Sequence, residues 1–155
     1  MAGKVLTTFT NGWPGQVSRS IDDIIESIAS GEATAEIKFG APVALDGGKV
    51  VNVSATKTDV VGIACRTIKT ENTYGQGDAS YLPKEMVDVL KRGTVTIEVS
   101  SGTPAAGGKV YIVKATGAFV AAADSTNTLE MAGWKFKGPK DANNVAEIVL
   151  TERVF

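Results

Sequence analysis

Histidine is absent from the 155-residue sequence, and cysteine occurs only once, as Cys65. Without histidine the chain lacks the commonest general base, the commonest metal ligand and every catalytic triad that uses imidazole. A single cysteine cannot form a disulfide within the chain, which fits a reducing compartment. Because Cys65 lies among apolar neighbours and has no histidine to activate it, we expect a buried, unreactive thiol. We therefore expect no catalytic residue, no metal site and no cofactor.

Excess charge and long apolar runs are missing as well. Sixteen basic and 17 acidic residues give a formal net charge of −1, so the chain has no electrostatic footprint for nucleic acid. No apolar run approaches the roughly 18 residues of a membrane span. The glycine-rich phosphate-binding motif is absent too. We expect no nucleic-acid, membrane or small-molecule partner.

A repeated strand–turn–strand pattern is what the sequence does contain. Residues 37–50 (IKFGAPVALDGGKV) are echoed by residues 97–110 (IEVSSGTPAAGGKV), and both segments end in Gly-Gly-Lys-Val. Each Gly-Gly pair precedes a β-rich segment, whereas a phosphate cradle needs a helix N-terminus, so we expect two hairpin turns. The repeat predicts two related units, at about residues 37–68 and 97–138.

Short β-rich segments with regularly spaced turn signals predict about eight to ten strands. The fold class is all-β, a compact antiparallel β-barrel or jelly-roll-like sandwich with at most one or two short helices. We expect residues 21–155 to form one β domain and residues 1–20 to form an extended N-terminal arm. Residues 82–90 are consistent with a helical turn or a strand, and Arg92-Gly93 is expected to turn the chain.

Residues 21–30 (IDDIIESIAS) are the strongest helical candidate in the first half of the chain. Ser20 is a suitable N-cap, and acidic residues follow in the expected first turn. The isoleucines fall at the spacing of one helical face, at Ile21, Ile24, Ile25 and Ile28. We interpret the segment as a short helix or turn, with a weakly alternating strand as the alternative.

Two segments carry candidate contact residues. Residues 13–17 (WPGQV) place a tryptophan beside a Pro-Gly turn, which either anchors a neighbouring protein or folds Trp13 onto its own core. Residues 70–81 form a glycine-rich loop framed by two tyrosines, which either contact a partner or anchor the loop to the barrel. The candidate contacts with a partner or another subunit are Trp13, Pro14, Gln16, the nearby Arg19, Tyr74 and Tyr81.

Five segments, in this order over about residues 11–150, resemble the capsid cement or head decoration proteins of tailed bacteriophages. They are WPGQV (13–17), FGAPV (39–43), KRGTVTIEV (91–99), GTPAAGGKVYIVKATGAF (102–119) and WKFKGPKDANNVAEIVL (134–150). The family supplies no catalytic motif. The segment IDDIIESIASG (21–31) departs from this resemblance, because it is more helix-like than we expect at this place in the family.

The resemblance implies a non-enzymatic virion protein that is made in the host bacterial cytoplasm and binds the exterior of the mature capsid. It would stabilise the capsid by bridging neighbouring subunits of the major capsid protein, as a homotrimer. We hypothesise that the barrel forms the trimer while the arm around Trp13 and the 70–81 loop reach the shell. Deleting residues 1–18 is then expected to abolish capsid binding and leave the fold intact.

Two alternatives stay open. The first is a phage tail, baseplate or fibre-associated β module, which assembly behaviour would distinguish, because tube proteins form six-fold rings or stacks. A carbohydrate-binding β-sandwich needs a row of exposed aromatic side chains, and the chain has only Trp13 and Trp134 as tryptophans.

Overall fold

The computed structural model describes residues 10–68 and 80–151, and within them it contains eleven strands and no helix. The predicted all-β class is confirmed. The strands are β1 (Val17–Ala29), β2 (Ile37–Lys38), β3 (Pro42–Asp46), β4 (Lys49–Asn52), β5 (Val60–Ala64), β6 (Ser80–Tyr81), β7 (Met86–Ser101), β8 (Lys109–Val113), β9 (Phe119–Val120), β10 (Thr128–Phe136) and β11 (Val145–Leu150).

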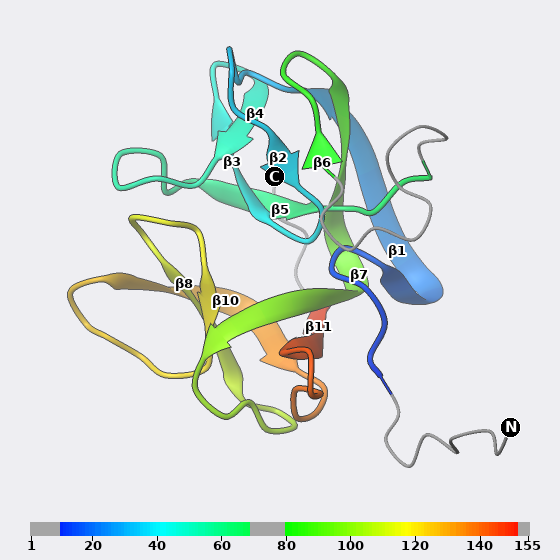
Figure 1. Ribbon diagram of the computed structural model, residues 1–155, viewed down its shortest axis with the longest axis vertical. Helices are drawn as coiled ribbons and strands as arrows, with labels where there is room; N and C mark the ends of the chain where they lie inside the picture. The colour runs from blue at the N-terminus through cyan, green and yellow to red at the C-terminus, as the bar shows by residue number, and fades with distance from the viewer. Residues whose placement is uncertain (1–9, 69–79, 152–155) are drawn as a thin grey trace, which may run out of the picture.

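Strand β7 runs through both halves of the molecule and organises them (Figure 1). Its first half pairs with β5 and with the end of β1, and its second half pairs with β11 and β9. We call the part built from β2–β6, the end of β1 and the first half of β7 the first lobe. The second lobe consists of the second half of β7 and strands β8–β11. One strand thus fixes the two lobes relative to each other.

The continuity of β7 corrects the turn expected at Arg92-Gly93. The strand continues through this point for 16 residues, and Gly93 has a φ of 127°. A Cβ at Gly93 would collide with the carboxylate of Asp23 on β1, so only glycine fits this position. The glycine thus bends the strand where it passes from one lobe to the other, and does not end it.

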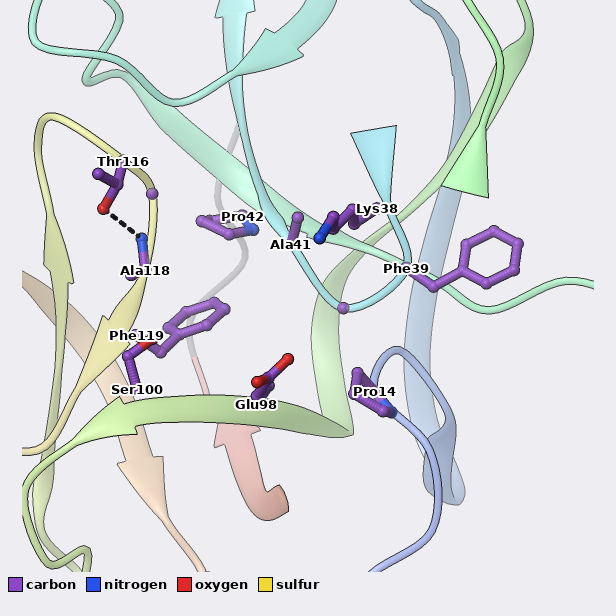
Figure 2. A pocket seen from close by; sticks show the side chains of 12 residues that line it. Pro14, Lys38, Phe39, Ala41, Pro42, Glu98, Ser100, Thr116, Ala118 and Phe119 are labelled. Carbon is purple, nitrogen blue, oxygen red and sulfur yellow. Dashed lines mark hydrogen bonds between the residues drawn. The ribbon is translucent and has the colours of Figure 1, made fainter. Parts of the chain in front are cut away.

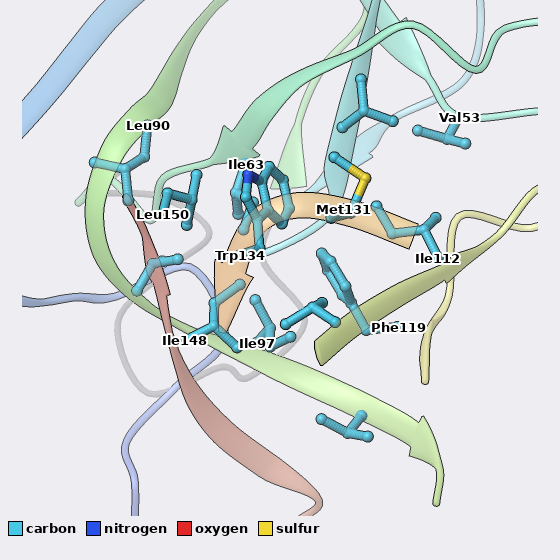
Figure 3. Close-up of a cluster of buried hydrophobic side chains, with 14 of the residues drawn as sticks. Val53, Ile63, Leu90, Ile97, Ile112, Phe119, Met131, Trp134, Ile148 and Leu150 are labelled. Carbon is cyan, nitrogen blue, oxygen red and sulfur yellow. The ribbon is translucent and has the colours of Figure 1, made fainter. Parts of the chain in front are cut away.

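The second lobe is a closed β-barrel, because β7, β11, β10, β8 and β9 pair in a ring. Its core surrounds Trp134, which is 0% exposed and lies 6.5 Å from Phe119 between ring centroids (Figure 3). Ile63 and Leu90 of the first lobe join this cluster. Each fully buried aliphatic side chain contributes about 1.5–3 kcal/mol, so the shared cluster holds the lobes together.

The first lobe has a smaller core of its own between β1, β3, β5 and β7, with Val87 and Val89 on the inner face of β7. Gly62 lies at a bulge of β5, and a Cβ there would collide with the backbone of Leu90, as expected for a close backbone contact. The chain leaving β1 meets β4, where the Gly31 N–H donates to the Val50 carbonyl at 2.8 Å.

Residues 21–30 are not a helix, which corrects the preferred interpretation. Residues 21–29 belong to the 13-residue strand β1, whose last residues pair with β7 from Ile25 opposite Leu90 to Ala29 opposite Met86, and Ser30 follows it as an isolated bridge to Val50. The alternation is weak because the partly exposed Glu26 forms an ion pair with the buried Lys91, at 2.8 Å between Nζ and Oε2, while Ile25 is 46% exposed. Long-range pairing of β-branched residues outweighs the helical spacing here.

The two Gly-Gly pairs have different roles. Gly47-Gly48 forms the predicted hairpin, with Asp46 opposite Lys49 in the β3–β4 ladder. The hairpin expected at Gly107-Gly108 is wrong, because β8 pairs with β10 and β9, not with the preceding β7. There the Gly107 N–H donates to the carbonyl of Phe136 on β10 at 2.8 Å. The same Gly-Gly-Lys-Val sequence therefore connects two paired strands in the first lobe and two strands that do not pair with each other in the second lobe.

Candidate functional site

Residues 13–16 form a tight turn that presents Trp13 at the surface. The Gln16 N–H donates to the Trp13 carbonyl at 3.2 Å, with Pro14 and Gly15 between them. Proline fixes φ at the second position and Gly15 has a φ of 83°, which is the pattern of a type II β-turn. We call the segment from Asn11 to Gln16 the hook.

Backbone hydrogen bonds tie the hook to both lobes. Gly15 donates its N–H to the Thr96 carbonyl of β7 at 2.7 Å and accepts the Arg66 N–H, from the first lobe, at 2.7 Å. Thr96 also donates its N–H to the Gln16 carbonyl at 3.0 Å and its hydroxyl to the Trp13 carbonyl at 2.5 Å. Further out, the Asn11 N–H donates to Asp141 at 2.7 Å. The turn is therefore a fixed element at the junction of the lobes.

Trp13 is 50% exposed, yet its ring has a defined neighbour. The Arg66 guanidinium carbon lies 5.5 Å from the centroid of the Trp13 ring and 5.5 Å from that of Phe39. A guanidinium over an aromatic face is attracted to the ring. The contact orients the indole while leaving about half of it open. No local pattern marks Arg66 for this role, because the contact joins residues far apart in sequence.

Arg19, another predicted contact, lies on the exposed side of β1. Its guanidinium forms an ion pair with Glu147 of β11, at 2.9 Å between Nε and Oε1, and the Ser18 hydroxyl donates to the same oxygen at 2.6 Å. Burial alone would raise the pKa of Glu147, but these two hydrogen bonds and the positive charges of Arg19 and Lys137 together outweigh burial and lower that pKa. The Gln16 side chain is exposed and folds back over the hook, where its Oε1 accepts the Trp13 N–H at 3.4 Å.

The two predicted tyrosines have different outcomes. Tyr81 is only 2% exposed, and its hydroxyl donates to the Cys65 carbonyl at 2.7 Å, so it anchors its own chain and is not a surface contact. Its ring packs edge-on against Phe39, 5.1 Å away between centroids. Tyr74 lies outside the described residues. The full burial of Trp134 also removes the row of exposed tryptophans that a sugar-binding surface would need.

Reactive groups are sparse in the described part of the chain. Burial, together with the negative charge of Asp88, raises the pKa of the Cys65 thiol to about 12, so it stays protonated at neutral pH. The same burial raises the pKa of Tyr81 to about 12. Among the residues that the structure describes, no cluster of three or more cysteine and carboxylate side chains could hold a metal, and no helix could span a membrane.

A family model for the structural cement protein of phages (E217 gp24/Pam3 gp6) matches residues 3–151 of the sequence. The chain belongs to this family. It is thus a phage structural cement protein, a class that is associated with the capsid. The match covers nearly the whole chain, both lobes and the hook included, and the resemblance identified from the sequence is confirmed.

One similar solved structure comes from "The capsid of Myoviridae Phage XM1". It aligns with a TM-score of 0.76 and 21% sequence identity over 99% of this chain and 98% of that chain. At this identity the likeness shows only that the two chains share a fold, over both lobes. No curated protein matches the sequence.

Proposed function

We propose that this cement protein binds the outer surface of the mature capsid and stabilises the shell by bridging neighbouring major capsid subunits, without any chemical reaction. The observation that carries the proposal is the hook, because it presents a half-exposed tryptophan on a turn held by both lobes. Tryptophans on rigid supports are frequent anchors of protein interfaces. A cement protein needs this kind of preformed adhesive point.

Bridging also requires a body that resists deformation. The two lobes share a hydrophobic cluster, a bent central strand and the hook, so force applied at one lobe passes to the other. An outward push by packaged DNA would then have to break the contacts of the cement protein as well as those of the shell. The mechanism depends on stiffness and on several weak contacts acting together.

The proposed assembly is a homotrimer in which the second-lobe barrel supplies the contacts between copies. A micromolar contact is worth about −8 kcal/mol. Three such contacts in one trimer raise the overall affinity through effective concentration, by roughly two to four orders of magnitude. We assign two parts of the chain to the capsid: the hook, with Trp13, Pro14 and Gln16, and the glycine-rich segment of the sequence that contains Tyr74.

The deciding experiment is co-sedimentation of the purified protein with expanded heads that lack it, with unexpanded proheads as the comparison. We expect saturable binding to expanded heads only, at a copy number that matches their three-fold positions. Equal binding to proheads, or none to either particle, contradicts the proposal. Six-fold rings of the free protein would instead favour the tail or baseplate alternative.

A point variant tests the hook better than deletion of residues 1–18, because the deletion would remove hydrogen bonds to both lobes. Trp13→Ala keeps every backbone bond of the hook, and we expect it to weaken head binding by at least about tenfold. Met86→Ala, which removes an exposed apolar side chain from the first lobe, is the matched control and should bind like the wild type. Unchanged binding by Trp13→Ala would exclude the hook as the anchor.

A further inference from the structure

A groove of about 220 Å³ lies beside the hook, where the two lobes meet (Figure 2). Residues 38–42 of the first lobe form one wall, and the turn before β9 with the second half of β7 forms the other. Pro14 of the hook closes one end. Phe119 is almost fully buried and supplies apolar surface at its base, whereas the Phe39 ring points away from the groove (Figure 2).

The dimensions of the groove indicate what it can hold. Sites for drug-sized ligands are generally about 300–1,000 Å³ and enclose most of the ligand. This groove is smaller and open to solvent, so it suits one side chain of a protein loop better than a free small molecule. Pockets that receive a single side chain at their centre are typical of the strongest points of protein interfaces.

Two charged side chains line the groove without an ion-pair partner among the described residues. Glu98 points from β7 toward residues 38–42, and Lys38 lies on that opposite wall (Figure 2). No salt bridge joins either side chain to another described residue, although Arg19, Lys57, Lys91, Arg92 and Lys109 all have one. Opposite charges flanking an apolar base complement a loop that carries an apolar residue between a basic and an acidic one.

We propose that this groove receives a loop of the major capsid protein, which inserts an apolar side chain between Lys38 and Glu98. The inference rests on the proposed capsid-binding function and adds a second contact to it. Continuity with the hook favours this occupant, because Pro14 lines the groove and its neighbour Trp13 is the half-exposed residue that we propose as the anchor. A loop bound to Trp13 would reach the groove across Pro14.

The test fills the groove and reverses its charges in the full-length protein. Ala118→Trp places a large ring in the groove, and we expect about tenfold weaker binding to expanded heads. Lys38→Glu and Glu98→Lys should each weaken binding several-fold and change its dependence on salt. Ala106→Trp, in the exposed turn before β8, is the control and should bind normally. Thermal unfolding of each variant shows whether its fold is retained.

The outcomes separate the groove from the proposed function. If the wild type does not bind heads, the capsid-binding function fails and the groove proposal fails with it. If the wild type binds and Trp13→Ala weakens binding, but all three groove variants are folded and bind normally, the groove proposal is overturned and the function stands. Groove variants that change the number of copies per assembly, but not head binding, would mean that the groove receives a second copy of this chain, which also overturns it.

Discussion

Gly15 of the hook and Gly40 of the first lobe pack backbone against backbone. A Cβ on Gly15 would lie 2.6 Å from the Gly40 nitrogen, and a Cβ on Gly40 would lie 2.7 Å from the Gly15 nitrogen. Both residues also have positive φ angles, 83° and 77°. Only a pair of glycines allows this approach, and through it the hook reaches the backbone of both lobes.

Substitution at either glycine should loosen the hook and destabilise the protein. Gly15→Ala and Gly40→Ala each add backbone strain and a collision with backbone atoms that cannot move aside cheaply. We expect a loss of about 3 kcal/mol, which corresponds to a fall in Tm of about 6–12 °C. Calorimetry or circular dichroism during heating measures the change.

Gly107→Ala separates the effect of backbone strain from the effect of the Cβ collision. Gly107 has a φ of 78°, but a Cβ there meets no atom within 4 Å. It should lose only the strain of the left-handed conformation, about 1–2 kcal/mol. Equal losses at Gly107 and Gly15 would show that the close approach of the two glycines adds nothing to stability.

The ion pair between Lys91 and Glu26 provides a second prediction about stability. The Lys91 side chain is almost completely buried and ends 2.8 Å from the Glu26 carboxylate. Glu26→Gln removes the negative charge beside a buried ammonium group while leaving an oxygen acceptor at a partly exposed position, so we expect a loss of about 1–3 kcal/mol in urea unfolding. The double variant Lys91→Met/Glu26→Gln removes both charges and should recover most of that loss. A double variant that is no more stable than Glu26→Gln alone would contradict this explanation.

Features specified by neighbouring residues could be predicted from the sequence. The Trp13–Gln16 turn follows from Pro14-Gly15, the β3–β4 hairpin follows from Gly47-Gly48, and the inert environment of Cys65 follows from its apolar neighbours. Each depends on φ preferences or on local composition. The all-β class follows in the same way from many short β-rich segments.

Features set by distant residues could not be predicted in this way. Residues 21–30 have helical spacing, but they pair with β7, about 65 residues further along the chain. Gly93 resembles a turn glycine, yet it is required by Asp23 across the sheet. Tyr81 ends a polar stretch of the sequence, and a hydrogen bond to the carbonyl of Cys65 holds it in the core. The groove is made by both lobes and the hook, so no single segment carries its pattern.

The free energy of unfolding should fall in alkaline solution because the Cys65 thiol and the Tyr81 hydroxyl are buried. The pKa of Cys65 rises from 9.0 to about 12 on folding, and that of Tyr81 rises from 10.0 to about 12. The folded state therefore binds these protons more tightly than the unfolded state does. The resulting contribution to the free energy of unfolding is fully present below pH 9 and is lost as the pH rises from 9 to 12. The urea midpoint measured across that range should decline. Cys65→Ala should decline less steeply, and an identical slope would show that the thiol does not contribute.

The two tryptophans allow capsid contact to be measured at one residue. Trp134 is fully buried and Trp13 is half exposed, so acrylamide should quench the fluorescence of Trp13 far more strongly. In Trp134→Phe the only remaining indole is Trp13, and expanded heads should protect it from quenching if the hook is the anchor. Trp13→Phe, which keeps only the buried indole, should show little quenching with or without heads. Both variants are compared with blanks of heads alone, and full quenching of Trp13 on saturated heads would place the hook outside the interface.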